Sequence, residues 1–154
     1  MRGVVIVLGA VFLLAACGGG SSSQASADTY RSQLAKIKQE SDQAQAQVEK
    51  GLSAKTIAEL RSKLDAFASA SQRISDEVAK LDAPENAAAA NAELAQGEHD
   101  TATATRAAST AIAKLKTAQA ALAYLQSKLG NARGAHELDD AIAKLKKLGY
   151  TSGS

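Results

Sequence analysis

Apolar residues recur every three or four positions along most of the chain, which is the spacing of one face of an α-helix. No stretch of alternating β-branched residues indicates a strand. Turn signals divide the pattern into four helices, expected at about 29–50, 54–81, 85–129 and 134–148. Short turns favour antiparallel neighbours, so the sequence predicts an all-α fold: an elongated antiparallel three- to four-helix bundle with coiled-coil-like heptad seams.

The first two helices carry the clearest registers. Asp28 is the expected N-cap of the first helix, and Gly51 is its expected end. Its inward positions are Tyr30, Leu34, Ile37, Ser41, Ala44 and Val48. For the second helix we expect Ser53 as N-cap, with Leu52 and Ile57 as a hydrophobic staple. A strict heptad then runs through Ile57, Leu60, Leu64, Phe67, Ser71, Ile74, Val78 and Leu81. We expect the polar Ser71 to bond back to its own helix.

The third helix follows a turn at residues 82–84, because Pro84 is tolerated in the first turn of a helix and not in its interior. Its register runs on to Leu129 without slipping phase. Gly97 and three nearby threonines have low helix propensity, so we expect a bend or break between 96 and 106, with an unbroken rod as the alternative. The leucines at 115–129 need a cover, which the fourth helix, a bend at the threonine-rich stretch or a second copy of the chain would provide.

Composition narrows the classes of protein. The hydrophobic fraction is 45%, but about half of it is alanine, so the core is thin and alanine seams must pack closely. Without residues 1–16 the chain has 17 bases and 16 acids, and a net charge of about +1 argues against a nucleic-acid partner. Residues 76–100 hold seven acids and one base, whereas 106–147 hold eight bases and three acids. This suits the dipole of the third helix, and a basic end contacting anionic lipid or wall polymer is the alternative.

Residues suited to catalysis or metal binding are sparse. His99 has no ligand type at helical spacing, and His136 precedes Asp139 and Asp140, which we expect to be solvated charges. We find no Glu-x-x-His pair, no phosphate-binding glycine loop and no nucleophile arrangement. The sequence therefore predicts a non-enzymatic protein with no catalytic residue, no metal site and no cofactor.

The beginning of the chain has the three parts of an export signal: Arg2, an apolar stretch over residues 4–14, and small residues before Cys17. The stretch is too short to span a membrane, which takes roughly 20 apolar residues. The order Leu14, Ala15, Ala16, Cys17 resembles the bacterial lipobox. This resemblance implies a diacylglyceryl group, with palmitate-type chains, on the Cys17 thiol and cleavage between Ala16 and Cys17. An ordinary secretory signal with an incidental cysteine is the alternative.

The lipobox resemblance sets the expected organisation of the chain. Residues 1–16 are the signal peptide, 17–27 are the lipidated cysteine with a Gly/Ser-rich tether, and 28–150 are the helical domain. The protein is then exported and anchored to the outer face of the cell membrane, or to the periplasmic face of an envelope membrane in a Gram-negative cell. Two acyl chains on one residue suffice for stable anchoring.

Three short segments resemble a group of small helical lipoproteins from high-GC Gram-positive bacteria: residues 53–56 opening a helix, 81–84 at the central turn, and the closing 148–150. Ile57 and Ala83 stand where that group would carry prolines. The resemblance implies an anchored all-helical domain without activity. The small murein-linking lipoprotein is also similar, but it attaches to the wall through a C-terminal lysine, and this chain ends in Ser154.

Together these observations predict a lipid-anchored envelope protein that acts as a structural or protein-interaction module. Its partners would be the membrane, through Cys17, and an envelope protein or cell-wall polymer of unknown identity, and it could form a homo-oligomer. The alternative is a small-ligand or ion-binding receptor at the membrane surface that uses the alanine-lined interior.

Overall fold

A computed structural model describes residues 23–51, 53–129 and 133–151. Within these ranges the chain forms five helices and no strand: α1 (Ser23–Gly51), α2 (Ile57–Val78), α3 (Ala88–Ile112), α4 (Ala118–Leu129) and α5 (Arg133–Lys147). The predicted all-α helical bundle is confirmed. The signal peptide, Cys17 and the first part of the tether lie outside the described residues. The tether was expected to reach residue 27, whereas the helix already begins at Ser23.

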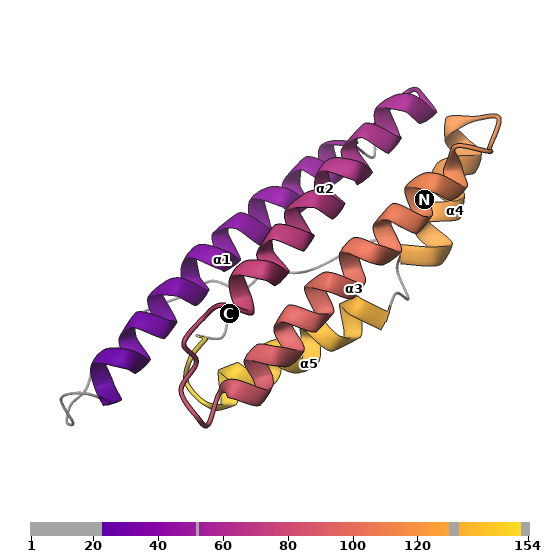
Figure 1. Ribbon diagram of the computed structural model, residues 1–154. Coiled ribbons are helices and arrows are strands. Elements are labelled where there is room, and N and C mark those ends of the chain that lie inside the picture. The colour runs from indigo at the N-terminus through magenta and orange to yellow at the C-terminus, as the bar shows by residue number, and fades with distance from the viewer. Residues whose placement is uncertain (1–22, 52, 130–132, 152–154) are drawn as a thin grey trace.

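The helices form an elongated bundle in which α1 and α2 lie side by side, α2 packs on α3, and α4 and α5 follow one another along α3 (Figure 1). One end of the bundle contains the start of α1, the turn at 79–87 and residues 148–151; we call it the tyrosine end, because Tyr30 and Tyr150 meet there. The other end contains the turns at 53–56 and 113–117, and we call it the lysine end. The two ends face opposite directions along the long axis.

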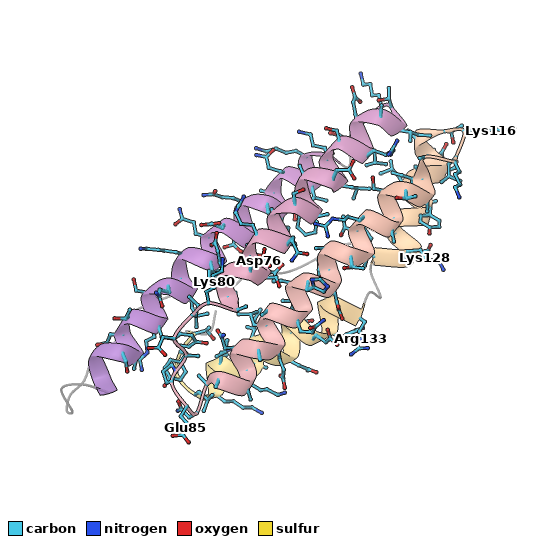
Figure 2. The ribbon with its side chains drawn as sticks, in the orientation of Figure 1. Asp76, Lys80, Glu85, Lys116, Lys128 and Arg133 are labelled. Atoms are coloured by element: carbon cyan, nitrogen blue, oxygen red, sulfur yellow. The ribbon has the colours of Figure 1, made fainter. Side chains whose placement is uncertain are left out.

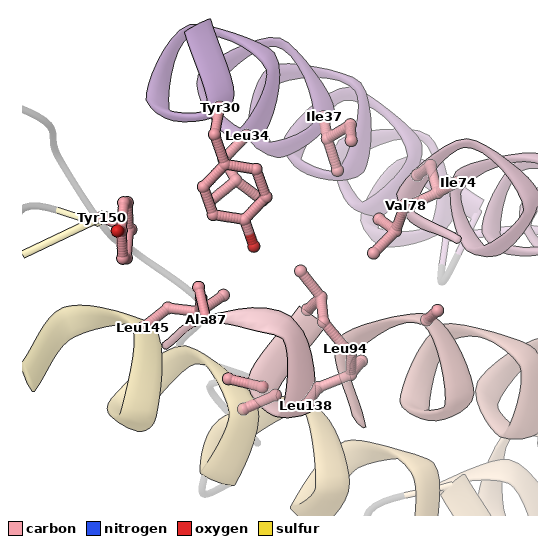
Figure 3. Packing of buried hydrophobic residues seen from close by; sticks show 13 residues of the cluster. Tyr30, Leu34, Ile37, Ile74, Val78, Ala87, Leu94, Leu138, Leu145 and Tyr150 are labelled. Carbon is pink, nitrogen blue, oxygen red and sulfur yellow. The ribbon is translucent and has the colours of Figure 1, made fainter. Parts of the chain in front are cut away.

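The core is divided into two clusters along this axis. The cluster at the tyrosine end joins α1, α2, α3 and α5, and its large members are Tyr30, Leu34, Ile37, Ile74, Val78, Leu94, Leu138, Leu145 and Tyr150 (Figure 3). The cluster at the lysine end joins α2, α3 and α4 through Leu60, Leu64, Ala108, Ile112, Ala121 and Leu125. Between them, at mid-height, the buried positions include polar side chains such as Ser71, Glu98 and Thr105.

The start of α1 differs from the prediction. Asp28 is not the N-cap, because it lies inside the helix, where its carboxylate pairs with Arg31 one turn later. The predicted inward face is confirmed at Tyr30, Leu34 and Ile37, which are buried. The later inward positions, up to Val48, are only half-buried, because that part of α1 packs against α2 alone.

The cap of α2 is Thr56 and not Ser53. The Thr56 hydroxyl accepts a hydrogen bond from the Glu59 amide at 3.2 Å, and the Glu59 carboxylate accepts one from the Thr56 amide at 3.3 Å. This reciprocal capping box satisfies two helix-start donors. Ser53 instead donates to the Lys50 carbonyl, and Leu52 of the predicted staple lies outside the described residues. The helix ends at Val78, three residues earlier than expected.

The heptad seam of α2 is confirmed. Five of its eight positions are buried, and the three others, Ile57, Phe67 and Leu81, are half-buried. The buried five are Leu60, Leu64, Ser71, Ile74 and Val78.

The break predicted between 96 and 106 is absent, because α3 runs unbroken from Ala88 to Ile112. Gly97 is not a weak point but a contact: a Cβ there would lie 3.0 Å from the Leu138 amide nitrogen of α5. The predicted long third helix instead breaks at 113–117. Thr117 ends the break, since its hydroxyl accepts a hydrogen bond from the Ala120 amide at 3.1 Å and so caps α4.

The break at 113–117 changes how α4 and α5 pack on the rest of the bundle. After the turn, α4 folds back so that Ala121 and Leu125 pack on Leu60, Leu64 and Ile112. The last helix, α5, therefore covers the first half of α3. The prediction that it covers the leucines at 115–129 is wrong. Those leucines are buried or half-buried within the chain itself, so they supply no reason for self-association.

Candidate functional site

Cys17 and the residues around it lie outside the described part of the chain, so the lipid attachment site and its cleavage site remain predictions. The described structure begins close to it. Only five residues separate Cys17 from Ser23, the first residue of α1. Six extended steps of chain reach at most about 20 Å. Any group attached to Cys17 is therefore held near the tyrosine end of the bundle.

At the tyrosine end, one hydrogen-bonded chain links three helices. The Tyr30 hydroxyl of α1 donates to the Asn91 side-chain oxygen of α3 at 3.0 Å. The Asn91 amide group in turn donates to the Val78 carbonyl of α2 at 2.9 Å. All three residues are buried, and burial, with a smaller contribution from the Tyr150 side chain, raises the pKa of Tyr30 to about 12. The tyrosine therefore stays a neutral donor throughout the physiological range.

The closing residues of the described chain are tied to the start of α1. The Tyr150 ring meets the Tyr30 ring edge-on, with centroids 5.2 Å apart, and its hydroxyl donates to Asn86 at 2.9 Å. The Arg31 side chain donates to the Gly149 carbonyl at 3.0 Å and lies 5.4 Å from the Tyr150 ring centroid. Gly149 has a φ of +77°, a conformation that glycine adopts without strain. The start of α1 and the last described residues, which are far apart in sequence, thus pack together at the tyrosine end, where Figure 3 shows Tyr30 and Tyr150.

The buried carboxyl of Glu98 is the strongest chemical anomaly in the described residues. Glu98 is 5% exposed and accepts a hydrogen bond from the Ser71 hydroxyl. Burial raises the pKa of this carboxyl to about 7, and the Ser71 bond offsets part of that rise. Ser71 was expected to bond to its own helix, but its partner lies on α3. A proton can therefore bind to or leave the middle of the bundle near neutral pH.

Sequence reasoning missed Glu98, although a signal was present. The predicted register placed Gly97 inward next to it. Glu98 nevertheless follows the buried Leu94 by four residues and precedes the buried Thr105 by seven, which is helical spacing. Its position opposite Ser71, the one polar position of the α2 seam, is what the tertiary structure adds.

Neither histidine belongs to a group of possible metal ligands in the described structure. His99 and His136 are exposed, as are Asp139 and Asp140. Among the described residues, no group of three or more His, Cys, Asp or Glu side chains could hold a metal ion.

Two grooves open on the described surface. One, of about 650 Å³, lies between α2 and α3 and is lined by several alanines and by polar side chains that include Asp76, Asn91, Gln96 and His99. The other, of about 780 Å³, lies between α1 and α2 and is lined by charged side chains that include Glu40, Arg73 and Glu77. Arg73 of α2 forms an ion pair across the groove with Glu40 of α1 and a second one with Glu77, one turn later on its own helix.

The uneven charge along the sequence is partly neutralised in space. Lys144 of α5 pairs with Glu93 of α3. Arg133, labelled in Figure 2, pairs with Glu137 and, at 4.0 Å, with Asp100. Bases of the last helix thus face acids in the first half of α3. These pairs are exposed, so each contributes little to stability.

Comparison with protein-family models, with curated proteins and with solved structures found no significant match to this chain. Within the described residues, no helix has the length and apolar content needed to cross a membrane.

Proposed function

We propose that the chain is a lipid-anchored envelope protein whose helical bundle acts as a non-enzymatic structural or protein-interaction module. The observation that carries this proposal is the lipobox-like order ending in Cys17, placed five residues before the bundle begins. A tether of that length would hold the tyrosine end near the headgroups. The hydrogen bonds at the tyrosine end support the proposal, because they would share a pull on the start of α1 with α2, α3 and residues 149–150.

The anchor is tested by labelling cells that express the full chain with a radioactive or clickable palmitate. The native chain should incorporate the label and remain with membranes after a high-salt wash. Cys17→Ala should lose the label, whereas Ser22→Ala, a matched change in the tether, should keep it. A native chain that carries no label, or a Cys17→Ala chain that carries as much, would refute the anchor.

The receptor alternative has one structural observation in its favour, the groove between α2 and α3. Thermal unfolding of the full chain with and without metal ions or envelope lipids tests it. A ligand present at 100 times its dissociation constant should add about 2.7 kcal/mol to the free energy of unfolding. No shift with any of these candidates would favour the module.

A further inference from the structure

The lysine end concentrates positive charge. Six bases lie in the turns at 53–56 and 113–117 and in the adjoining turns of α1 and α2, and all six are exposed: Lys50, Lys55, Arg61, Lys63, Lys114 and Lys116. Residues 49–63 and 109–127, which make up this end, contain six bases and two acids, a net charge of +4. The whole chain has a net charge of +2, so the remainder carries −2. The positive charge of the protein is therefore gathered at one end.

These bases do not serve ion pairs within the described structure. Every ion pair found there lies elsewhere in the bundle, on Arg31, Lys38, Arg73, Arg133 or Lys144. The two acids at the lysine end have other partners. Glu59 accepts from the amides of Lys55 and Thr56, and Glu49 lies 3.5 Å from the Gln45 side-chain amide. The lysines are free to meet an external anion.

The fold brings the two basic turns together. Ile57 and Leu60, at the start of α2, belong to the same cluster as Ile112 and Leu115, at the end of α3. Lys55 and Lys114 immediately flank this cluster from the two turns. Figure 2 shows Lys116 at this end of the molecule and Glu85 at the opposite one.

These six exposed bases, which we call the patch, suit a flexible polyanion better than a single bound anion. Five of the six bases are lysines, which act as mobile point charges and do not form the planar, bidentate contacts of arginine. Neither of the two grooves described above reaches these turns. Lys50 is the only one of the six bases that lines a groove. A surface of separate exposed cations matches repeated charges along a polymer, with affinity that falls as salt rises.

The position of the patch distinguishes a polymer from the anchoring membrane. Helix α1 has 29 residues and is about 43 Å long, several times the Debye length of about 8 Å at physiological salt. The lysine end therefore exerts little attraction on a charged surface located at the tyrosine end.

We propose that the lysine end binds an anionic polymer with repeating phosphate groups that lies beyond the membrane. The outward orientation rests on the proposed function, because it requires the anchor at Cys17. The binding itself does not, since it depends only on residues of the bundle.

The test measures binding of the full chain, in non-ionic detergent, to long-chain inorganic polyphosphate at several salt concentrations. The triple variant Lys55→Gln, Lys114→Gln, Lys116→Gln is compared with Lys80→Gln, Lys146→Gln, Lys147→Gln. The control lysines lie at or near the tyrosine end, are exposed, and form no ion pair in the described structure. Both variants lose three charges, so they differ only in where the charge is lost. Circular dichroism establishes that both keep the helical fold.

The first triple should weaken binding by about tenfold or more at low salt and reduce the slope of log affinity against log salt by about 2, whereas the control should change affinity by about twofold or less. Equal losses in both variants, or no binding by the native chain, would overturn the proposal. Tighter binding to phosphatidylglycerol vesicles than to polyphosphate, lost in the first triple, would assign the patch to a membrane instead. The assay contains no anchored protein, so its failure leaves the palmitate test of Cys17 untouched.

Discussion

Gly134 of α5 lies against Thr101 of α3 so closely that a Cβ on Gly134 would be 2.6 Å from both the Thr101 amide nitrogen and its hydroxyl oxygen. Real Cβ atoms do not approach a backbone nitrogen this closely. The same Cβ would lie 2.8 Å from the Gly97 carbonyl oxygen. The contact between α3 and α5 therefore depends on two glycines, one on each helix. A larger residue at position 134 should weaken this contact.

Gly134→Ala should destabilise the protein, although alanine is the better helix former by about 1 kcal/mol. The added methyl group must displace the backbone of α3, and overpacking of this kind costs typically about 1–3 kcal/mol. Urea unfolding followed by circular dichroism measures the difference. Ala143→Ser, an exposed change on the same helix, should stay within about 0.5 kcal/mol of the native chain. A Gly134→Ala chain more stable than the native one would show that α5 does not pack this closely.

Glu98→Gln should remove a pH dependence of stability. The folded pKa of about 7 lies above the ordinary value of 4.5, because burial disfavours the charge. The contribution of the protonated carboxyl to the free energy of unfolding is fully present below about pH 4.5. It is lost as the pH rises to about 7. The loss amounts to about 3 kcal/mol at most. Above pH 7, Glu98→Gln should therefore be more stable than the native chain.

The measurement for Glu98 is urea unfolding at intervals between pH 4.5 and 8.5. Glu85→Gln, a change at an exposed acid in the turn at the tyrosine end, is the matched control and should follow the native pH profile. If Glu98→Gln and the native chain lose stability in parallel over this range, the carboxyl is not buried as described.

Tyr30→Phe should cost about 1–3 kcal/mol, because it leaves the buried Asn91 oxygen without its donor while keeping the ring contacts. Tyr124→Phe is the matched control, since Tyr124 is half-buried and its hydroxyl forms no hydrogen bond in the described structure. The control should be nearly neutral. Equal effects of the two changes in thermal unfolding would argue against the link between α1 and α3.

Thr56→Ala should cost about 1 kcal/mol, because it removes the hydroxyl that caps α2. Ser53→Ala removes only an exposed bond to the Lys50 carbonyl and should have a smaller effect. Denaturant unfolding of the two variants side by side separates the cap found in the structure from the one expected from sequence. A larger loss for Ser53→Ala would reverse that assignment.

Much of the fold could be read from periodicity. The heptad of α2 and the inward face at Tyr30, Leu34 and Ile37 follow from spacing alone, because a helix that packs on one side buries a fixed stripe. The ends of helices were harder. Thr56 competes with Ser53 three residues earlier, and only the presence of Glu59 at the third helical position favours the threonine.

Other features depended on contacts between distant residues. Gly97 has a low intrinsic helix propensity, but its role is set by Leu138 and Gly134, 37 and more residues away in the chain. The break at 113–117 was hidden because the apolar register continues in phase from Ile112 to Leu115 and Leu122 across it. Glu98 could be placed opposite Ser71 only once the relative heights of α2 and α3 were known.

The proposed lipid on Cys17 is tested most directly by the intact mass of the protein extracted from membranes of an expressing bacterium. We expect a chain that begins at Cys17 and carries a diacylglyceryl group, with the added mass localised to the N-terminal peptide by fragmentation. A chain that begins elsewhere, or one whose Cys17 thiol is unmodified and reacts with a maleimide, would contradict it.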